Sequence, residues 1–190
     1  MNLKSYSRKT HPLDSYKAYI LDMDGTLYHQ FPVRACMAVS LAVYYIFRLN
    51  RLREVFEIKR FRRAIESGAL EPAEGVVKYW MEEAPLKYIK MFKNNKLLSF
   101  IENQKQRGAV IVVYSDHPVK EKCAAINLNA DYTFCALDKQ INCLKPDANG
   151  LKYIVNILNL DTKDIVYIGD RYKKDGLCAA SGGIDYWQVK

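Results

Sequence analysis

Three short apolar runs along the chain each end in polar residues. They are KAYIL at 17–21, AVIVVY at 109–114 and DIVYI at 164–168, and they lead into Asp22, Ser115 and Asp170. Runs of this length and composition are typical of strands that are buried on both faces of a parallel sheet. Two weaker runs, 132–136 and 184–189, complete a predicted sheet of about five strands. Ligands of such sheets bind beyond the carboxyl ends of the strands, so a functional site is expected at that edge.

Helical patterns lie between these strands. Apolar residues recur three and four positions apart in segments 95–107, 118–126 and 148–158. Pro118 and Pro146 stand near helix starts, where proline is tolerated. The alternation of strand and helix predicts an α/β fold, a Rossmann-like doubly wound parallel sheet with right-handed crossovers.

Residues 31–91 interrupt this alternation, because they show helical spacing and no convincing strand. We therefore predict a core formed by 1–30 and 92–190, with a small all-helical insertion at 31–91 after the first strand. The longest apolar run, 35–47, lies in the insertion and is shorter than the ~20 residues that a membrane span needs, so a buried helix is expected. The arginine-rich segment 48–63 allows two interpretations: contacts with an anionic substrate, or a solvated helix face with i,i+4 partners.

Composition narrows the function classes only in part. The chain has 190 residues, 49% of them hydrophobic, which is enough for one compact domain with a core. The net charge of +8 favours acidic partners of any kind, from phosphorylated metabolites to nucleic acid or lipid headgroups. Five cysteines without a CxxC pair argue against a disulfide framework and a zinc site and suit the cytoplasm. The first thirteen residues are polar and basic, so no cleavable signal and a loose arm are expected.

The sequence DMDGT at 22–26 carries the clearest chemical signal. Asp22 and Asp24 are two positions apart at the end of a predicted strand, so Met23 can point away while both carboxylates approach one centre. Gly25 permits the sharp turn that a residue with a Cβ would resist. Taken alone, the same residues also suit a surface turn or a calcium-type acidic loop.

DMDGT belongs to the first of four motifs that occur in a fixed order along the chain. They are DMDGTLY at 22–28, Ser115 after the strand AVIVVY, Lys145 in LKPD, and GDRYKKD at 169–175. This set resembles the haloacid dehalogenase superfamily, specifically its phosphatases with a helical cap, and covers the core. The resemblance implies a Mg²⁺-dependent phosphoric monoester hydrolase that acts on a small phosphorylated metabolite, such as a sugar phosphate or a nucleotide. Residues 31–91, which carry no motif, would form the cap.

The resemblance also implies a role for each motif residue. Asp22 would attack phosphorus to form an aspartyl-phosphate, and Asp24 would protonate the leaving group and then activate water. The implied phosphate-binding residues are Gly25, Thr26, Ser115, Asp116 and Lys145. The implied Mg²⁺ ligands are Asp22, the backbone carbonyl of Asp24, Asp170 and, through water, Asp175. The spacing from Asp170 to Asp175 is one residue longer than the tightest family pattern, which leaves the role of Asp175 open.

Two other functions are considered. A phosphomutase or phosphotransferase would pass the phosphoryl group from Asp22 to a sugar hydroxyl, although Thr26 favours hydrolysis, since mutases of the family more often carry an aliphatic residue there. A binding module would dock its basic helices on nucleic acid or an acidic membrane. Retention of all four motifs argues against that module, so no stable nucleic-acid or membrane partner is expected. The oligomeric state is left open.

Overall fold

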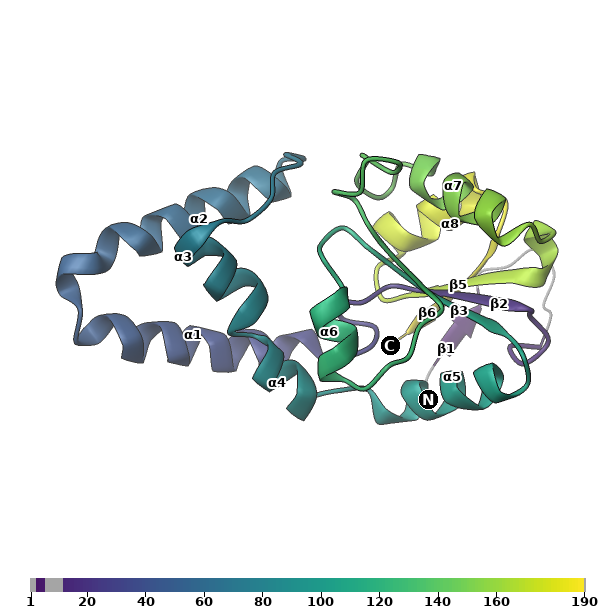
Figure 1. Ribbon diagram of the computed structural model, residues 1–190, viewed down its shortest axis with the longest axis horizontal. Helices are drawn as coiled ribbons and strands as arrows, with labels where there is room; N and C mark the ends of the chain where they lie inside the picture. Colours follow the sequence, from purple (N-terminus) through teal and green to yellow (C-terminus); the bar gives the residue numbers. More distant parts are fainter. Residues whose placement is uncertain (1–2, 6–11, 190) are drawn as a thin grey trace.

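The computed structural model describes residues 3–5 and 12–189, and its centre is a six-stranded sheet with the strand order β1-β6-β5-β2-β3-β4 (Figure 1). The strands are β1 Leu3–Ser5, β2 Ala18–Leu21, β3 Val110–Ser115, β4 Tyr132–Cys135, β5 Ile165–Gly169 and β6 Asp185–Val189. The five predicted strands are confirmed and run parallel. The expectation of a loose arm is wrong for 3–5, which pair antiparallel with β6. Residues 1–2 and 6–11 of that arm lie outside the described residues.

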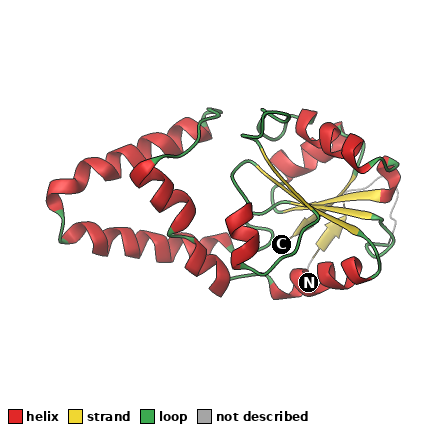
Figure 2. Cartoon of the chain, viewed as in Figure 1, coloured by secondary structure: helices red, strands yellow, loops and turns green. Residues whose placement is uncertain are grey.

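Helices cover both faces of the sheet, so the core has three layers (Figure 2). One side carries α5 Asn95–Gln106 and α6 Lys120–Ala125, and the other carries α7 Asn149–Leu158 and α8 Leu177–Ser181. Successive side chains of β2 point to opposite faces: Tyr19 and Leu21 pack in the cluster that contains Leu97 of α5, whereas Ile20 packs in the cluster that contains Leu151 of α7. The predicted doubly wound α/β fold is therefore confirmed. Helix α8 was not predicted.

Strand β2 holds the central position on which the site depends. It pairs in parallel with β3 on one side and with β5 on the other, and Ala18 is level with both Val110 and Ile165. The three strands therefore end at the same edge of the sheet. The polar residues that follow them in the sequence must gather there.

Residues 31–91 form the helical insertion, called the cap below. Its elements are α1 Gln30–Ile46, a 3₁₀ turn Leu49–Arg51, α2 Leu52–Glu66, α3 Gly75–Lys78, a π-helical turn Tyr79–Glu83 and α4 Leu86–Met91. Helices α1 and α2 extend away from the sheet and are joined at the free end of the cap (Figure 1). Tyr45, Ile58 and Trp80 form a small hydrophobic cluster of the cap itself, while Ile89 of α4 packs into the cluster of the main core.

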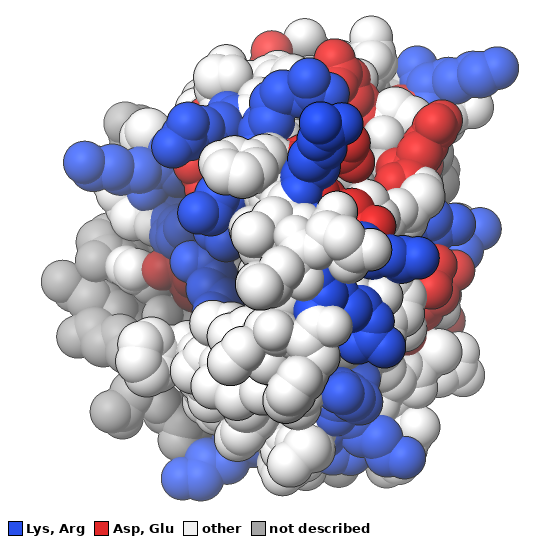
Figure 3. Space-filling view, turned by 90° about the vertical axis from the view of Figure 1, so that its left-hand side faces the viewer, with Lys and Arg blue, Asp and Glu red and all other residues white. Residues whose placement is uncertain are grey.

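The apolar run 35–47 is buried on one face only, which corrects the expectation of a buried helix. Tyr45 is 4% exposed, but Val39, Val43 and Ile46 are 64%, 57% and 63% exposed. The surface at the free end of the cap combines uncharged areas with lysine and arginine side chains (Figure 3). Among the described residues no single helix is long and apolar enough to cross a membrane; α1 and residues 49–66 pass that test only as a pair, which is bent by 115°.

Candidate active site

Asp22 follows the last residue of β2 and is 1% exposed. Its backbone N–H donates to the carbonyl of Ile168 in β5 at 2.9 Å, so sheet pairing extends through this position. Thr26 Oγ1 donates to Asp22 Oδ2 at 3.1 Å, and Lys145 Nζ donates to Asp22 Oδ1 at 2.6 Å. Burial raises the pKa of Asp22 to about 7, although Lys145 acts in the opposite direction. Both carboxylate oxygens are therefore oriented by the protein itself.

Gly25 is required by both its backbone conformation and its neighbour. Its φ is +98°, in the region where a side chain is strained. A Cβ at this position would lie 2.3 Å from Asp170 Oδ2, far inside van der Waals contact. The glycine therefore makes the predicted turn and also allows the Asp170 carboxylate to approach the backbone that follows β2.

Lys145 is fully buried and connects two of the carboxylates. Its Nζ lies 2.6 Å from Asp22 Oδ1 and 2.6 Å from Asp175 Oδ1, and it donates to the hydroxyl oxygen of Tyr167 at 3.1 Å. Burial alone would lower the pKa of Lys145, but Asp22, Tyr167 and Asp175 outweigh it and raise the pKa well above its usual range. The side chain is therefore an ammonium that neutralises part of a strongly acidic site.

Asp175 reaches the site through the π-helical turn Tyr172–Gly176, which accommodates the extra residue between Asp170 and Asp175. The side chain is fully buried, and its Oδ2 accepts a hydrogen bond from the backbone N–H of Arg171 at 3.0 Å. Gly169 makes this approach possible, since a Cβ there would lie 2.6 Å from the Asp175 carboxyl group. The longer spacing thus does not remove Asp175 from the site.

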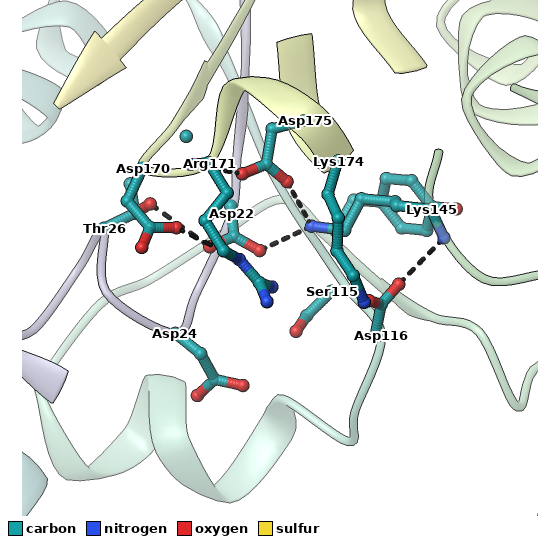
Figure 4. Close-up of polar contacts among 12 residues, drawn as sticks. Asp22, Asp24, Thr26, Ser115, Asp116, Lys145, Asp170, Arg171, Lys174 and Asp175 are labelled. Atoms are coloured by element: carbon teal, nitrogen blue, oxygen red, sulfur yellow. Dashed lines mark hydrogen bonds and ion pairs between the residues drawn. The ribbon is translucent and has the colours of Figure 1, made fainter. Parts of the chain in front are cut away.

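Asp22, Asp170 and Asp175 form a cluster that could hold a cation (Figure 4). One carboxylate oxygen from each lies within 4.8 Å of the others. Asp170 Oδ1 is buried and has no hydrogen-bond partner within the described ranges, although Arg171 Nε lies 3.7 Å away. Burial raises the pKa of Asp170 to about 6, with a further contribution from Asp175 and an opposing one from Arg171. Three carboxylates supply the hard oxygen ligands that Mg²⁺ prefers, and one of their oxygens is buried without a hydrogen-bond partner among the described residues. The cluster therefore fits Mg²⁺, the ion that the resemblance implies.

The Asp24 carboxylate lies outside this cluster (Figure 4). Its Oδ1 accepts a hydrogen bond from Lys122 Nζ at 2.6 Å and a short one from the Tyr28 hydroxyl. Burial would raise the pKa of Asp24, but Lys122 and then His117 outweigh burial and hold the pKa well below its usual range. The expectation that both carboxylates approach one centre is therefore met by Asp22 and not by the Asp24 side chain. A metal contact through the Asp24 carbonyl stays a prediction.

Ser115 is the last residue of β3, Asp116 follows it, and both lie near Lys145 (Figure 4). Ser115 Oγ is buried and accepts a hydrogen bond from the backbone N–H of His117 at 3.4 Å. Asp116 Oδ1 accepts from the Lys145 backbone N–H at 3.0 Å, and its Oδ2 accepts from Lys174 Nζ at 2.9 Å. The Asp116 carboxylate therefore fixes the two lysine-bearing segments. Phosphate binding by Ser115 and the Asp116 amide stays a prediction.

A cavity of about 430 Å³ lies between this edge of the core and the cap. Its core side includes Asp24, Asp116, Lys122, Arg171 and Lys174. Its cap side is mainly apolar and is lined by side chains of α1, α2 and the following π-helical turn, among them Val33, Met37, Leu41, Ile58, Phe61, Ile65, Trp80 and Met81. A volume of this size suits a small organic molecule.

Sequence reasoning missed the basic residues that accompany the predicted acids. Lys122 is 7% exposed, but in the sequence KEKCAA nothing separates it from a solvated helix lysine. Its partner Asp24 is 98 positions away, so no local pattern reports the contact. Arg171 and Lys174 lie inside the fourth motif, and their position there was an available signal.

Comparison with known proteins agrees with the fold. Residues 16–183 match the model of the haloacid dehalogenase-like hydrolases. No curated protein matches the sequence significantly.

Among solved structures, an HAD phosphatase from Thermococcus onnurineus is similar with a TM-score of 0.65 at 18% identity, over 90% of this chain and 84% of that one. The 2-haloacid dehalogenase from Pseudomonas syringae pv. Tomato DC3000 has a TM-score of 0.65 at 16% identity, over 90% and 85% of the two chains. Magnesium-bound YfnB from Bacillus subtilis has a TM-score of 0.63 at 14% identity, also over 90% and 85%. The TM-scores show a shared fold, and at such low identity they show the fold alone, whereas the family model matches most of the sequence. The chain belongs to the haloacid dehalogenase-like hydrolases.

Proposed function

We propose that the chain is a Mg²⁺-dependent phosphatase that hydrolyses a small phosphomonoester through an aspartyl-phosphate on Asp22. The observation that carries the proposal is the Asp22 carboxylate, held by Lys145 and Thr26 at the end of the central strand, within 4.8 Å of Asp170 and Asp175. When bound there, Mg²⁺ would screen the negative charges of the nucleophile and the phosphate.

The first step transfers the phosphoryl group to the protein. An Asp22 oxygen forms a bond to phosphorus as the bond from phosphorus to the leaving oxygen breaks. Asp24 gives a proton to that oxygen, so the product leaves as an alcohol. Because the Lys122 ion pair holds Asp24 as a carboxylate in the resting protein, Asp24 must take up this proton before the step. Lys145 holds Asp22 in place and balances its charge.

The second step restores the protein. Asp24, now a carboxylate, takes a proton from a water molecule whose oxygen attacks phosphorus, and the bond to Asp22 breaks to release phosphate. The ion pair with Lys122 and the hydrogen bond from Tyr28 favour the carboxylate form that accepts this proton. Water as the acceptor separates this proposal from the phosphomutase alternative, in which a sugar hydroxyl would occupy the same place.

The cavity supports a narrower choice of substrate. Of the basic cap residues in segment 48–63, only Arg62 lines it, and Arg62 is paired with Glu66, which also lines it, at 3.8 Å. The remaining cap-side wall is mainly apolar, apart from Gln30, Arg34 and the acids Glu71 and Glu82. We therefore propose a leaving group with a substantial apolar part, and the arginine-rich segment belongs to the outer surface of the cap.

Hydrolysis of p-nitrophenyl phosphate with Mg²⁺ tests the reaction. Asp22→Asn should lower the rate by about three orders of magnitude or more, because the nucleophile is lost. Asp161→Asn is the matched control, since Asp161 is an exposed surface carboxylate that pairs with Lys163. Equal rates in the parent and Asp22→Asn, or full activity after removal of divalent ions, would contradict the proposal.

A substrate series tests the apolar leaving group. Among straight-chain alkyl phosphates, kcat/KM should rise about fourfold with each added methylene until the cavity is filled. If sugar phosphates or nucleotides give higher kcat/KM than alkyl and aryl phosphates, the apolar wall does not select the leaving group. The reaction on Asp22 could then still be correct.

A further inference from the structure

Helix α1 carries an apolar stripe on the face that points away from the cap interior. No charged residue occurs between positions 34 and 48. Exposed side chains recur at helical spacing along this face, and we call them the outer stripe: Phe31, Ala35, Val39, Ala42, Val43 and Ile46. Val33, Met37 and Leu41, on the opposite face, line the cavity. The helix is thus apolar on both faces, although only one face contacts the rest of the described chain.

The stripe continues around the free end of the cap. Phe47, Leu49 and Phe56 are 82%, 68% and 70% exposed, although these residue types are usually buried. A contiguous apolar surface of this kind marks an interaction site in a folded protein.

Basic residues are in excess in the helix pair of α1 and α2, to which the stripe belongs. The hairpin from 30 to 66 contains eight basic and three acidic residues. Its exposed basic residues are Arg34, Arg48, Arg51, Arg53, Lys59, Arg60, Arg62 and Arg63. Within the described chain, ion pairs join Arg51 to Glu54 at 3.7 Å and Arg62 to Glu66 at 3.8 Å, and both distances are long. Figure 3 shows lysine and arginine at the border of uncharged surface on this end of the molecule.

We propose that the outer stripe docks on the surface of an anionic lipid bilayer. An amphipathic surface helix inserts apolar side chains at the boundary between headgroups and acyl chains, while neighbouring arginines contact the anionic headgroups. The exposed valines, isoleucine and phenylalanines match the first requirement, and the excess of arginine matches the second. The docked helix lies along the surface and does not span the bilayer.

The charges disfavour a second copy as the occupant of the stripe. A two-fold interface would bring the same surface from both chains together and place arginines near arginines. Nucleic acid would satisfy the arginines but would leave the valines and isoleucine without an apolar partner. The proposal departs from the sequence-based expectation of no membrane partner, which was drawn from the retention of the four motifs and took no account of exposed residues in 35–47.

Vesicle co-sedimentation of the full chain tests the proposal. The protein should bind vesicles of phosphatidylcholine and phosphatidylglycerol, bind phosphatidylcholine alone weakly, and dissociate as salt is raised. Val43→Ser with Phe47→Ser should weaken binding about tenfold or more. Arg53→Gln with Arg60→Gln should weaken it roughly thirtyfold. Ile157→Ser with Lys152→Gln, exposed positions on α7, is the matched control and should leave binding unchanged.

Several outcomes overturn the proposal. One is the absence of binding to anionic vesicles by the parent protein, because no substitution could then have disturbed the fold. Others are equal binding to both kinds of vesicle, or equal loss in the α7 control. Light scattering tests a second copy as the occupant. If the parent protein is a dimer that does not bind vesicles, and Val43→Ser with Phe47→Ser dissociates this dimer, the stripe belongs to a second copy. Circular dichroism of each variant shows that the helices are retained.

Discussion

Lys122 Nζ lies 2.6 Å from Asp24 Oδ1, and the two side chains are each only 9% exposed. The contact joins helix α6 of the core to the turn after β2, beside the cavity under the cap. An ion pair in such a place loses most of its hydration, so each partner depends on the other for its charge. The proposed general acid/base is therefore held by a cation that belongs to none of the four motifs.

Replacement of Lys122 by methionine should destabilise the protein. The change keeps the length of the side chain but leaves the Asp24 carboxylate without its cation, which should lower the free energy of unfolding by about 3 kcal/mol at neutral pH. Asp24→Asn should recover part of this loss in the double variant, because the orphaned charge is removed. Urea unfolding measures both values. Lys120→Met, at an exposed position of the same helix, should change little, and a strictly additive double variant would show that the pair is not coupled.

Asp24→Asn should separate the two chemical steps. The p-nitrophenolate ion leaves without a proton, so the variant should still form the aspartyl-phosphate from p-nitrophenyl phosphate but hydrolyse it slowly. Rapid mixing should then show a burst of p-nitrophenol equal to the amount of protein, followed by a steady rate about a hundredfold or more below the parent. An alkyl phosphate, whose leaving oxygen needs the proton, should give no burst. Asp22→Asn should give no burst with either substrate, and the same result for Asp24→Asn would remove the proposed division of roles.

Gly25→Ala should lower the free energy of unfolding by more than its backbone conformation alone explains. Gly68 offers a matched comparison, because its φ is +102° and no atom lies within 4 Å of the Cβ position. Gly68→Ala should lower stability by about 1 kcal/mol from backbone strain. Gly25→Ala adds a collision with Asp170 and should lower Mg²⁺ affinity as well as stability. Equal effects of the two changes on unfolding, with unchanged Mg²⁺ affinity by titration calorimetry, would show that Asp170 does not need this approach.

The sequence was sufficient for the elements whose pattern is local. Each of the five parallel strands is recognisable from its own residues, and three of the four motifs stand where a strand ends, so the sequence pattern alone places the site at one edge of the sheet. Strand β1 was missed because three residues carry too little pattern, and its existence depends on pairing with β6 at the other end of the chain. Lys122 was missed for the same reason, since its partner is distant in sequence.

Helix α1 shows a different limit. A helical segment that is apolar on all sides has no preferred face, so its pattern cannot tell which side the protein covers. The sequence supports a buried helix, and only the structure separates the inner face, with Met37 and Leu41, from the exposed Val39 and Val43. The π-helical turn at Tyr172–Gly176 could not be predicted from the sequence either, because a single inserted residue changes spacing without changing composition.

Magnesium should stabilise the protein more at alkaline than at acidic pH. Burial raises the pKa of Asp22 to about 7 and of Asp170 to about 6, both above the usual value for a carboxyl group. The metal-free folded protein therefore binds more protons at these two groups than the unfolded chain, so their contribution to stability is complete below about pH 4 and is lost as pH rises through 6 to 7. Mg²⁺ replaces those protons, and at a hundredfold excess over its Kd it should add about 3 kcal/mol near pH 8. Near pH 5 the gain should be smaller, since protons compete for the same oxygens.

Thermal unfolding with and without Mg²⁺ across this pH range measures the effect. The His117 imidazole, whose pKa burial lowers, acts in the opposite sense in the metal-free protein, so the comparison must be made against a variant that keeps His117. Asp22→Asn with Asp170→Asn serves this purpose, because it removes both carboxyl groups whose pKa is raised. In this variant Mg²⁺ should no longer raise the unfolding temperature. An equal Mg²⁺ response at both pH values, or its persistence in the double variant, would place the ion elsewhere. The contacts of Asp22 and Asp175 with Lys145 would then be structural and would not prepare a metal site.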